Sequence, residues 1–152
     1  MLRFRSALTA LSVVGLVTAG CATTASPSAS ASAGGTNIDV TLQEFAVLPS
    51  TPSASAGEVT FHVTNNGPDD VHEFVIVKTD LAPDALPTTE DGSVDEAGEG
   101  IEPVDEIEDI AVGAREDLTV TLEAGNYVLL CNIVEAGEVH YESGMRTAFS
   151  VE

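Results

Sequence analysis

From residue 37 onward, the chain is built of short runs that either alternate between apolar and polar side chains or are β-branched and apolar, separated by Gly- or Asn-containing turn signals. Ile38-Asp39-Val40-Thr41-Leu42 is one alternating run. A period of two puts every second side chain on one face of a strand, so each alternating run predicts a strand with one face in a core. The runs cover residues 38–42, 59–64, 71–78, 118–122, 126–131 and 147–151. Since no stretch carries a sustained helical stripe, we predict an all-β fold, a small β-sandwich formed by residues 37–152.

Residues 79–110 depart from this pattern. Three of the seven prolines lie here, and between Asp84 and Asp109 there are eleven acidic residues and no basic one. We expect an irregular excursion along one side of the sandwich, because a run of charge is usually a solvated face. A calcium site at residues 91–96 is the alternative, but the spacing of their oxygen ligands misses that of the EF-hand loop.

The first 20 residues have the form of an export signal. Arg3 and Arg5 give a basic start, residues 7–19 form an apolar run too short to span a bilayer, and small residues precede Cys21. This arrangement resembles a bacterial lipoprotein signal, in which the cysteine after the cleavage site is lipidated and becomes the first residue. We therefore predict a signal peptide at residues 1–20 and lipidation of Cys21. Ordinary secretion with a free cysteine is the alternative.

Residues 21–36 combine this cysteine with a linker rich in Ala and Ser that has no hydrophobic period. The linker would act as a flexible tether. The predicted location is therefore the outer face of the cell membrane, extracellular or periplasmic, with the lipid as anchor. We expect Cys131, the second of two cysteines, to stay out of a disulfide with Cys21, because its thiolate is needed elsewhere.

The charge balance is strongly acidic. The formal net charge is −20, and loss of Arg3 and Arg5 with the signal leaves three basic residues against 25 acidic ones, or −22. This excludes nucleic acid as a partner and predicts repulsion from an anionic membrane surface. A partly basic protein partner would be attracted, although solubility alone also explains such a charge. We expect a monomer.

Four side chains stand out as candidate metal donors: His72, Cys131, His140 and Met145. One thiolate, two imidazoles and one thioether form the set that copper takes in a blue-copper site, a Cys/His/His plane with a weak axial Met. Zinc sites are usually built without thioether, and calcium or magnesium sites are built from oxygens. Each residue alone has a simpler explanation as core filler or a polar group, which we adopt for His62 because it should face solvent. The joint occurrence predicts one copper ion.

The alternation indicates how these donors could converge. His72 shares a strand face with Phe74 at the start of one run, and Cys131 shares a face with Leu129 at the end of another. If the two strands are antiparallel neighbours, the two donors meet at one pole of the sandwich. His140 and Met145 would then come from the loop before the last strand.

The stretch Gly125-Asn-Tyr-Val-Leu-Leu-Cys131, followed by His140, Gly144-Met145 and a closing strand, resembles the cupredoxin family over about residues 38–152. The resemblance implies a Greek-key β-sandwich and the four copper ligands named above. The Cys-x8-His-x4-Met spacing matches the copper domain of nitrite reductases and is longer than the loops of plastocyanin or azurin.

The resemblance also assigns roles outside the ligand set. Tyr127 matches the family's tyrosine corner, whose hydroxyl ties a loop to backbone. His140 corresponds to the ligand at the solvent edge, through which electrons pass. Where many cupredoxins carry Asn after the first His, this chain has Glu73, so the side chain that joins the two ligand loops is missing or replaced.

The function that follows is a type 1 (blue) copper protein, a membrane-tethered carrier of single electrons outside the cytoplasm that exchanges them with a redox protein partner. Two alternatives are a copper module for storage, delivery or sensing, and a metal-free interaction domain. We expect no enzyme. Multicopper oxidases need His-x-His clusters, and three histidines are too few for them.

Overall fold

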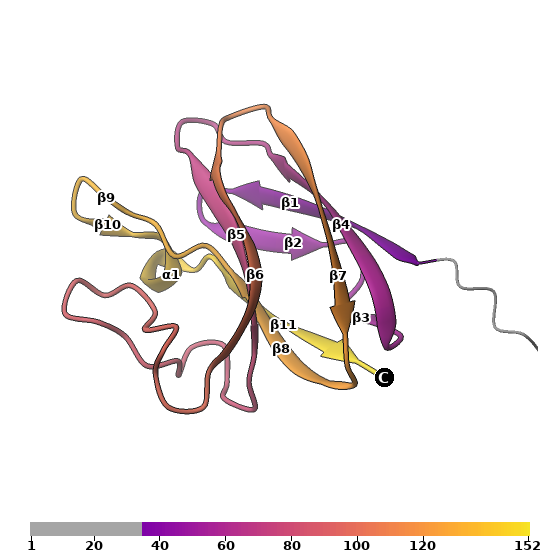
Figure 1. Ribbon diagram of the computed structural model, residues 1–152. Helices are drawn as coiled ribbons and strands as arrows, with labels where there is room; N and C mark the ends of the chain where they lie inside the picture. The colour runs from indigo at the N-terminus through magenta and orange to yellow at the C-terminus, as the bar shows by residue number, and fades with distance from the viewer. Residues whose placement is uncertain (1–34) are drawn as a thin grey trace, which may run out of the picture. The chain divides into compact units, whose positions relative to one another are not determined.

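The computed structural model describes residues 35–152, and the predicted signal peptide, Cys21 and most of the linker lie outside these residues. Two β-sheets form the domain (Figure 1). The first has the strand order β2-β1-β4-β7 and the second β3-β11-β8-β5-β6. The first sheet contains β1 (Thr36–Gln43), β2 (Ala46–Pro49), β4 (Gly57–Asn65) and β7 (Arg115–Leu122). The second contains β3 (Ser53–Ala54), β5 (His72–Lys78), β6 (Glu102–Ile110), β8 (Gly125–Leu130) and β11 (Arg146–Val151).

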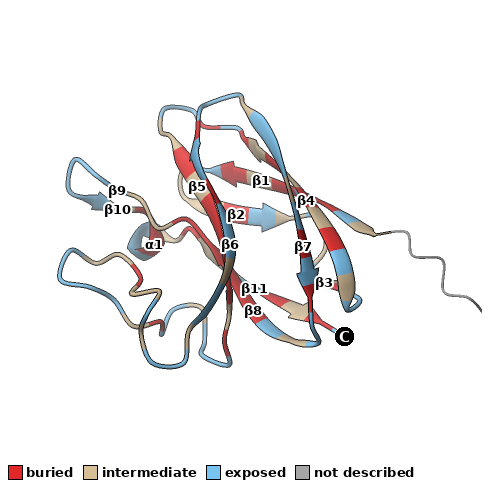
Figure 2. Cartoon of the chain, viewed as in Figure 1, coloured by how far each residue is buried: buried red, intermediate tan, exposed pale blue. Residues whose placement is uncertain are grey.

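The main core lies between the two sheets. Phe61 of β4 contacts Phe74 of β5 and Phe149 of β11, with ring centroids 5.3 and 5.7 Å apart. Buried and half-buried residues alternate along most of β4, and its inner positions are buried, as Figure 2 shows. Burying one such aromatic side chain stabilises the fold by about 1.5–3 kcal/mol. The predicted all-β sandwich is confirmed, and His62 lies on the outer face of β4 where its Nδ1 contacts Asp117 at 2.6 Å.

A second, smaller core lies on the outer face of β5 and β8. Val75 and Val77 of β5 pack there with Val128 and Leu130 of β8. Residues 79–101, which we call the covering segment, close this core with two buried side chains, Leu86 and Val94. The strand β5 is therefore buried on both faces, which explains why its sequence is almost continuously apolar.

The sequence expectation for residues 79–110 is wrong in its last third. Residues 102–110 form β6, an edge strand that pairs antiparallel with β5. Two register shifts interrupt this pairing, and the buried residues Ile107 and Ile110 are three positions apart rather than two. The bulges thus removed the alternation that would have revealed a strand. The acidic side chains on its exposed face are typical of a protected sheet edge.

Five short elements also went unpredicted: β2, β3 and three elements that follow β8. The hairpin strands β9 (Val134–Glu135) and β10 (Glu138–Val139) and the single-turn helix α1 (His140–Ser143) all lie between β8 and β11. Each is too short to leave a periodic pattern.

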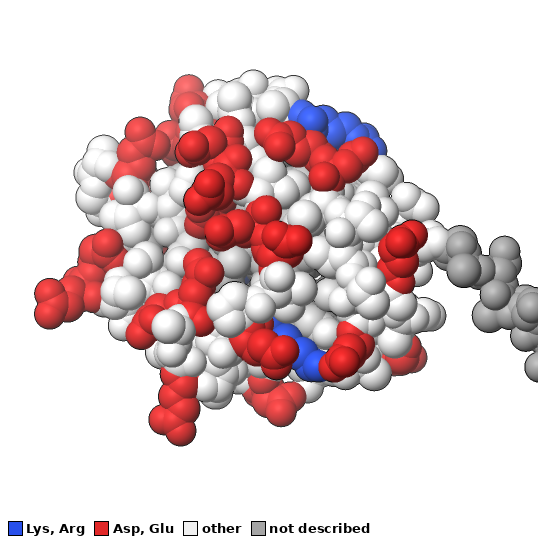
Figure 3. Space-filling view, viewed as in Figure 1, with Lys and Arg blue, Asp and Glu red and all other residues white. Residues whose placement is uncertain are grey.

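The surface is acidic over wide areas, as the space-filling view in Figure 3 shows for one face. Within residues 35–152 the three basic side chains are all engaged. Lys78 binds Glu123 at 2.9 Å, Arg115 binds Asp39 at 3.2 Å, and the guanidinium of Arg146 lies 4.9 Å from the ring centroid of Tyr141. No helix in this part of the chain has the length and apolar character needed to cross a membrane.

Candidate metal centre

The antiparallel pairing of β5 and β8 brings the first two donors together. Val75 lies opposite Leu130 and Ile76 opposite Leu129. The start of β5, at His72, therefore lies beside the end of β8, where Cys131 follows. Both side chains are fully buried, as the alternation along the two strands predicted.

The segment from Cys131 to β11 folds back over these donors. The hairpin β9–β10 leads into α1, whose first residue is His140. Three backbone hydrogen bonds hold this return. The N–H of Cys131 donates to the carbonyl of Met145. The N–H of Met145 donates in turn to the carbonyl of His140. The N–H of His140 donates to the carbonyl of Ile133, and each bond is 3.0 Å long. Gly144 ends the helix at φ 125°, a conformation that favours glycine.

Three donor atoms converge at this pole. The distance between Nδ1 of His72 and Nδ1 of His140 is 3.2 Å. Sγ of Cys131 lies 3.4 Å from Nδ1 of His140 and 3.9 Å from Nδ1 of His72. Bonds of about 2.0 Å to nitrogen and about 2.3 Å to sulfur, as zinc makes, let one ion bridge gaps of this size. Met145 is fully buried in the same cluster as Cys131.

Burial sets the protonation of these groups in the metal-free protein. Burial raises the pKa of the Cys131 thiol to about 11, against a smaller opposing effect of backbone N–H donors. Burial also lowers the pKa of His72, and the neighbouring His140 lowers it further. A neutral imidazole is ready to bind a metal, whereas the thiol must first release its proton.

Glu73 joins the two segments that carry the ligands. Its backbone N–H donates to Sγ of Cys131 at 3.4 Å, and its carboxylate Oε1 accepts the backbone N–H of Asn132 at 2.7 Å. The side chain that many cupredoxins place here is therefore replaced and not simply missing. Burial raises the pKa of Glu73 to about 7.

Two further contacts hold loops in place, one at the far end of β8 from the donors and one beside the site. The hydroxyl of Tyr127 donates to the carbonyl of Glu123 at 2.8 Å, which is the contact expected of a tyrosine corner. The buried side chain of Asn65 donates to the carbonyls of Asp70 and Ile110 at 2.8 and 2.9 Å. Asn65 thus fixes the loop that enters β5 at His72.

His140 does not form the solvent edge that the family resemblance implied. The residue is 1% exposed, and the half-buried ring of Phe45 packs edge-on against its imidazole at a centroid distance of 5.2 Å. Phe45 belongs to the turn between β1 and β2, so a residue far away in the chain covers this ligand.

Sequence reasoning missed four residues that surround the site: Glu44, Phe45, Asn132 and Tyr141. The side chain of Asn132 accepts the N–H of Val94 at 2.5 Å and donates to its carbonyl at 3.0 Å. Asn132 and Tyr141 directly follow ligands, as Glu73 does, and this adjacency was an available signal. Glu44 and Phe45 gave none, because the strand pairing of the sheet brings them to the pole.

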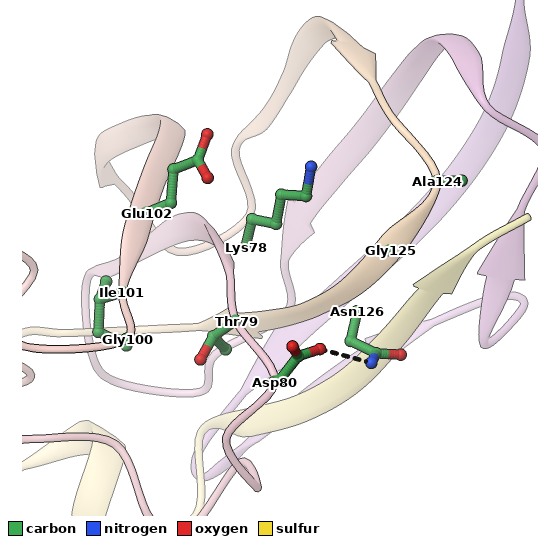
Figure 4. Close-up of a pocket in the computed structure, with 9 residues that line it drawn as sticks. All are labelled: Lys78, Thr79, Asp80, Gly100, Ile101, Glu102, Ala124, Gly125 and Asn126. Carbon is green, nitrogen blue, oxygen red and sulfur yellow. Dashed lines mark hydrogen bonds between the residues drawn. The ribbon is translucent and has the colours of Figure 1, made fainter.

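An open surface pocket lies at the far end of β5 and β8 from the donors (Figure 4). It is lined by Lys78, Thr79, Asp80, Gly100, Ile101, Glu102, Ala124, Gly125 and Asn126. Several of its polar side chains already have partners: Asp80 accepts from Asn126 at 2.9 Å, and Lys78 donates to Glu123 at 2.9 Å. It therefore offers no reactive arrangement to compare with the donor cluster.

The two sheets and the donor cluster at their pole define a cupredoxin fold with a site that fits one type 1 copper ion. A scan against protein-family models and a search of curated proteins each give no match. Among solved structures, dithionite-reduced auracyanin from Roseiflexus castenholzii is similar at a TM-score of 0.55 and 23% identity, over 77% of this chain and 97% of that one. Auracyanin B is similar at a TM-score of 0.53 and 16% identity, over 77% of this chain and 88% of that one. Rusticyanin from Thiobacillus ferrooxidans is similar at a TM-score of 0.51 and 20% identity, over 78% of this chain and 79% of that one.

Proposed function

We propose that this chain is a type 1 copper protein that carries single electrons outside the cytoplasm. The convergence of His72, Cys131 and His140 on one buried point carries the proposal, with Met145 buried in the same hydrophobic core as Cys131 and bonded to its backbone. A copper ion bound there would supply the one-electron change between Cu(II) and Cu(I). Because strands β5 and β8 fix two of the donors, little protein rearrangement would accompany that change.

The chain's own residues have separate tasks in this function. Nδ1 of each histidine and Sγ of Cys131 would hold the ion, and Met145 would supply the weak axial donor. Burial excludes water from all four side chains. The N–H of Glu73 and the backbone of Met145 orient Cys131.

Burial of the donors favours electron transfer over copper delivery. All four side chains are at most 1% exposed, and Phe45 lies against the outermost histidine. An ion held in this way would exchange slowly with a second protein, whereas an electron needs no opening of the site. We do not propose an enzymatic activity, because a substrate in solution would not reach donors that are at most 1% exposed.

The partner and location belong to the same proposal. The acidic surface suits a redox protein with a basic docking face and repels nucleic acid. A lipid on Cys21 would hold the domain at the outer face of the membrane through the linker of residues 22–36.

Titration of the purified protein with Cu(II) tests the function. We expect one equivalent to produce an intense visible band and a narrow copper hyperfine splitting in electron paramagnetic resonance, followed by reversible one-electron reduction. Cys131→Ala should abolish the band. A Cu(I) complex with no reversible couple would instead indicate storage or delivery, and no change on copper addition would indicate a metal-free domain.

A further inference from the structure

Two buried polar atoms without hydrogen-bond partners belong to neighbouring side chains, the first ligand His72 and Glu44. Nε2 of His72 and Oε2 of Glu44 are both inaccessible and have no partner within residues 35–152. The second carboxylate oxygen, Oε1 of Glu44, lies 3.6 Å from Nε2 of His72. Buried polar atoms nearly always find partners, so this pair calls for an explanation.

The fold holds the Glu44 carboxylate in this place. Glu44 lies in the turn between β1 and β2, and β1 pairs parallel with β4, which leads to His72. Oε1 accepts the backbone N–H of Asp70 at 2.7 Å and that of Asp69 at 3.2 Å. Two N–H donors stabilise an ionised carboxylate and fix its position.

The imidazole presents its second nitrogen to this anion. Because Nδ1 of His72 is the nitrogen that faces Cys131 and His140, a metal bound there leaves the proton on Nε2. Metal-bound histidines generally donate that N–H to a carboxylate, carbonyl or water, which fixes the tautomer and raises the basicity of the ligand. Glu44 is the carboxylate in reach.

We propose that Glu44 is a positioning residue that holds His72 in the Nε2–H tautomer and favours Cu(II) over Cu(I). The proposal rests on the proposed function for its redox consequence. A fixed negative charge stabilises the more positive ion, so it lowers the reduction potential. Loss of such a partner typically weakens metal binding about 10- to 100-fold. A tenfold loss confined to Cu(II) corresponds to a potential about 59 mV higher.

The test compares Glu44→Gln with Asp69→Asn. The first change removes the buried charge and keeps an oxygen that can accept the N–H of Asp70. The second removes an exposed charge from the loop between β4 and β5, whose backbone contacts the Glu44 carboxylate, and serves as the matched control. In the copper-loaded protein we expect Glu44→Gln to raise the midpoint potential by about 59 mV or more, with a much smaller rise in Asp69→Asn. Equal shifts in both variants, or no shift in Glu44→Gln, would overturn the redox effect.

Nitrogen-15 resonances of the imidazole test the positioning without copper. In the metal-free protein, His72 should be mainly the Nε2–H tautomer, and Glu44→Gln should shift it toward a mixture. An unchanged tautomer would overturn the positioning role. If the wild-type protein gave no copper band, the proposed function would fail, and the tautomer measurement would still decide whether Glu44 orients His72.

Discussion

The carboxylate of Glu73 accepts the backbone N–H of Asn132 at 2.7 Å, and this contact joins the two segments that carry the metal ligands. Glu73 follows His72, and Asn132 follows Cys131. Since the N–H of Glu73 also donates to Sγ of Cys131, one residue fixes both the distance between the segments and the orientation of the thiol. The side chain that does so is ionisable, which gives this pole of the sandwich a pH dependence.

Glu73→Gln should change how the stability of the metal-free protein depends on pH. Burial raises the pKa of Glu73 from 4.5 to about 7, so the folded state binds its proton more tightly than the unfolded state. The stability from this proton is fully present below pH 4.5 and is lost as pH rises through about 7. We would measure the free energy of unfolding by denaturant at pH 4 and pH 8. Relative to the wild type, that of the variant should be about 1–2 kcal/mol higher at pH 8 than at pH 4.

Glu116→Gln provides the comparison for that measurement. Glu116 is exposed on β7, so its replacement should leave the difference between pH 4 and pH 8 almost unchanged. If Glu73→Gln followed the wild type at both pH values, the carboxylate would titrate normally and the contact to Asn132 would carry no pH dependence.

Copper binding should release a proton from Cys131. Burial raises the pKa of this thiol to about 11, so it is protonated at pH 8, while the metal takes the thiolate. Cu(II) affinity should therefore rise about tenfold per pH unit around pH 8. Calorimetry in two buffers of different ionisation enthalpy would measure one proton released per ion from the thiol. An affinity independent of pH would contradict this, and Cys131→Ala should lose the release.

The sequence predicted those parts of the fold that follow one periodicity over several residues. The strands β1 and β4 each bury one face, and their alternation located them, whereas β8 was located as an apolar run and is buried on both faces. The strand β6 was missed because bulges put its buried residues Ile107 and Ile110 three positions apart. The covering segment was placed on one side of the sandwich, but its contribution of Leu86 and Val94 to a core was hidden among acidic residues.

At the site, chemistry was more informative than pattern. The mixture of sulfur and imidazole donors singled out His72, Cys131, His140 and Met145. The inward-facing positions along two strands predicted the pole where Cys131 lies. Neither could reveal Glu44 and Phe45, because their positions follow from the parallel pairing of β1 with β4. Contacts that depend on which strands become neighbours leave no trace in local sequence.

Phe45→Ala should speed electron exchange at His140. The half-buried ring of Phe45 packs against the His140 imidazole, which is only 1% exposed, so truncation shortens the path to solvent. Stopped-flow reduction by a small cationic cobalt complex should be faster, with the midpoint potential little changed. The stability cost should stay below the ~3–5 kcal/mol of a fully buried phenylalanine. Leu48→Ala, at an exposed apolar position on β2, should leave the rate unchanged. If Phe45→Ala were reduced at the same rate as the wild-type protein, electrons would enter and leave by a path other than His140.

Tyr141→Phe should loosen the covering segment without altering the copper spectrum. The Tyr141 hydroxyl donates to the carbonyl of Pro83 at 2.7 Å and accepts the buried N–H of Leu86 at 3.2 Å. Removing it leaves that N–H unpaired, at a cost of about 1–3 kcal/mol. Hydrogen exchange should accelerate over residues 83–94. The ligand His140 is held separately, through backbone bonds to Ile133 and Met145, so the visible band should persist.

Tyr127→Phe is the matched control for this prediction. It also removes one tyrosine hydroxyl, whose partner is the carbonyl of Glu123 at the other end of β8. We expect a comparable loss of stability with no selective acceleration over residues 83–94. If both variants accelerated exchange there equally, the covering segment would respond to global stability, and Tyr141 would not be its specific attachment. Selective acceleration in Tyr141→Phe with an intact band would show that this segment can open while the metal ligands stay in place.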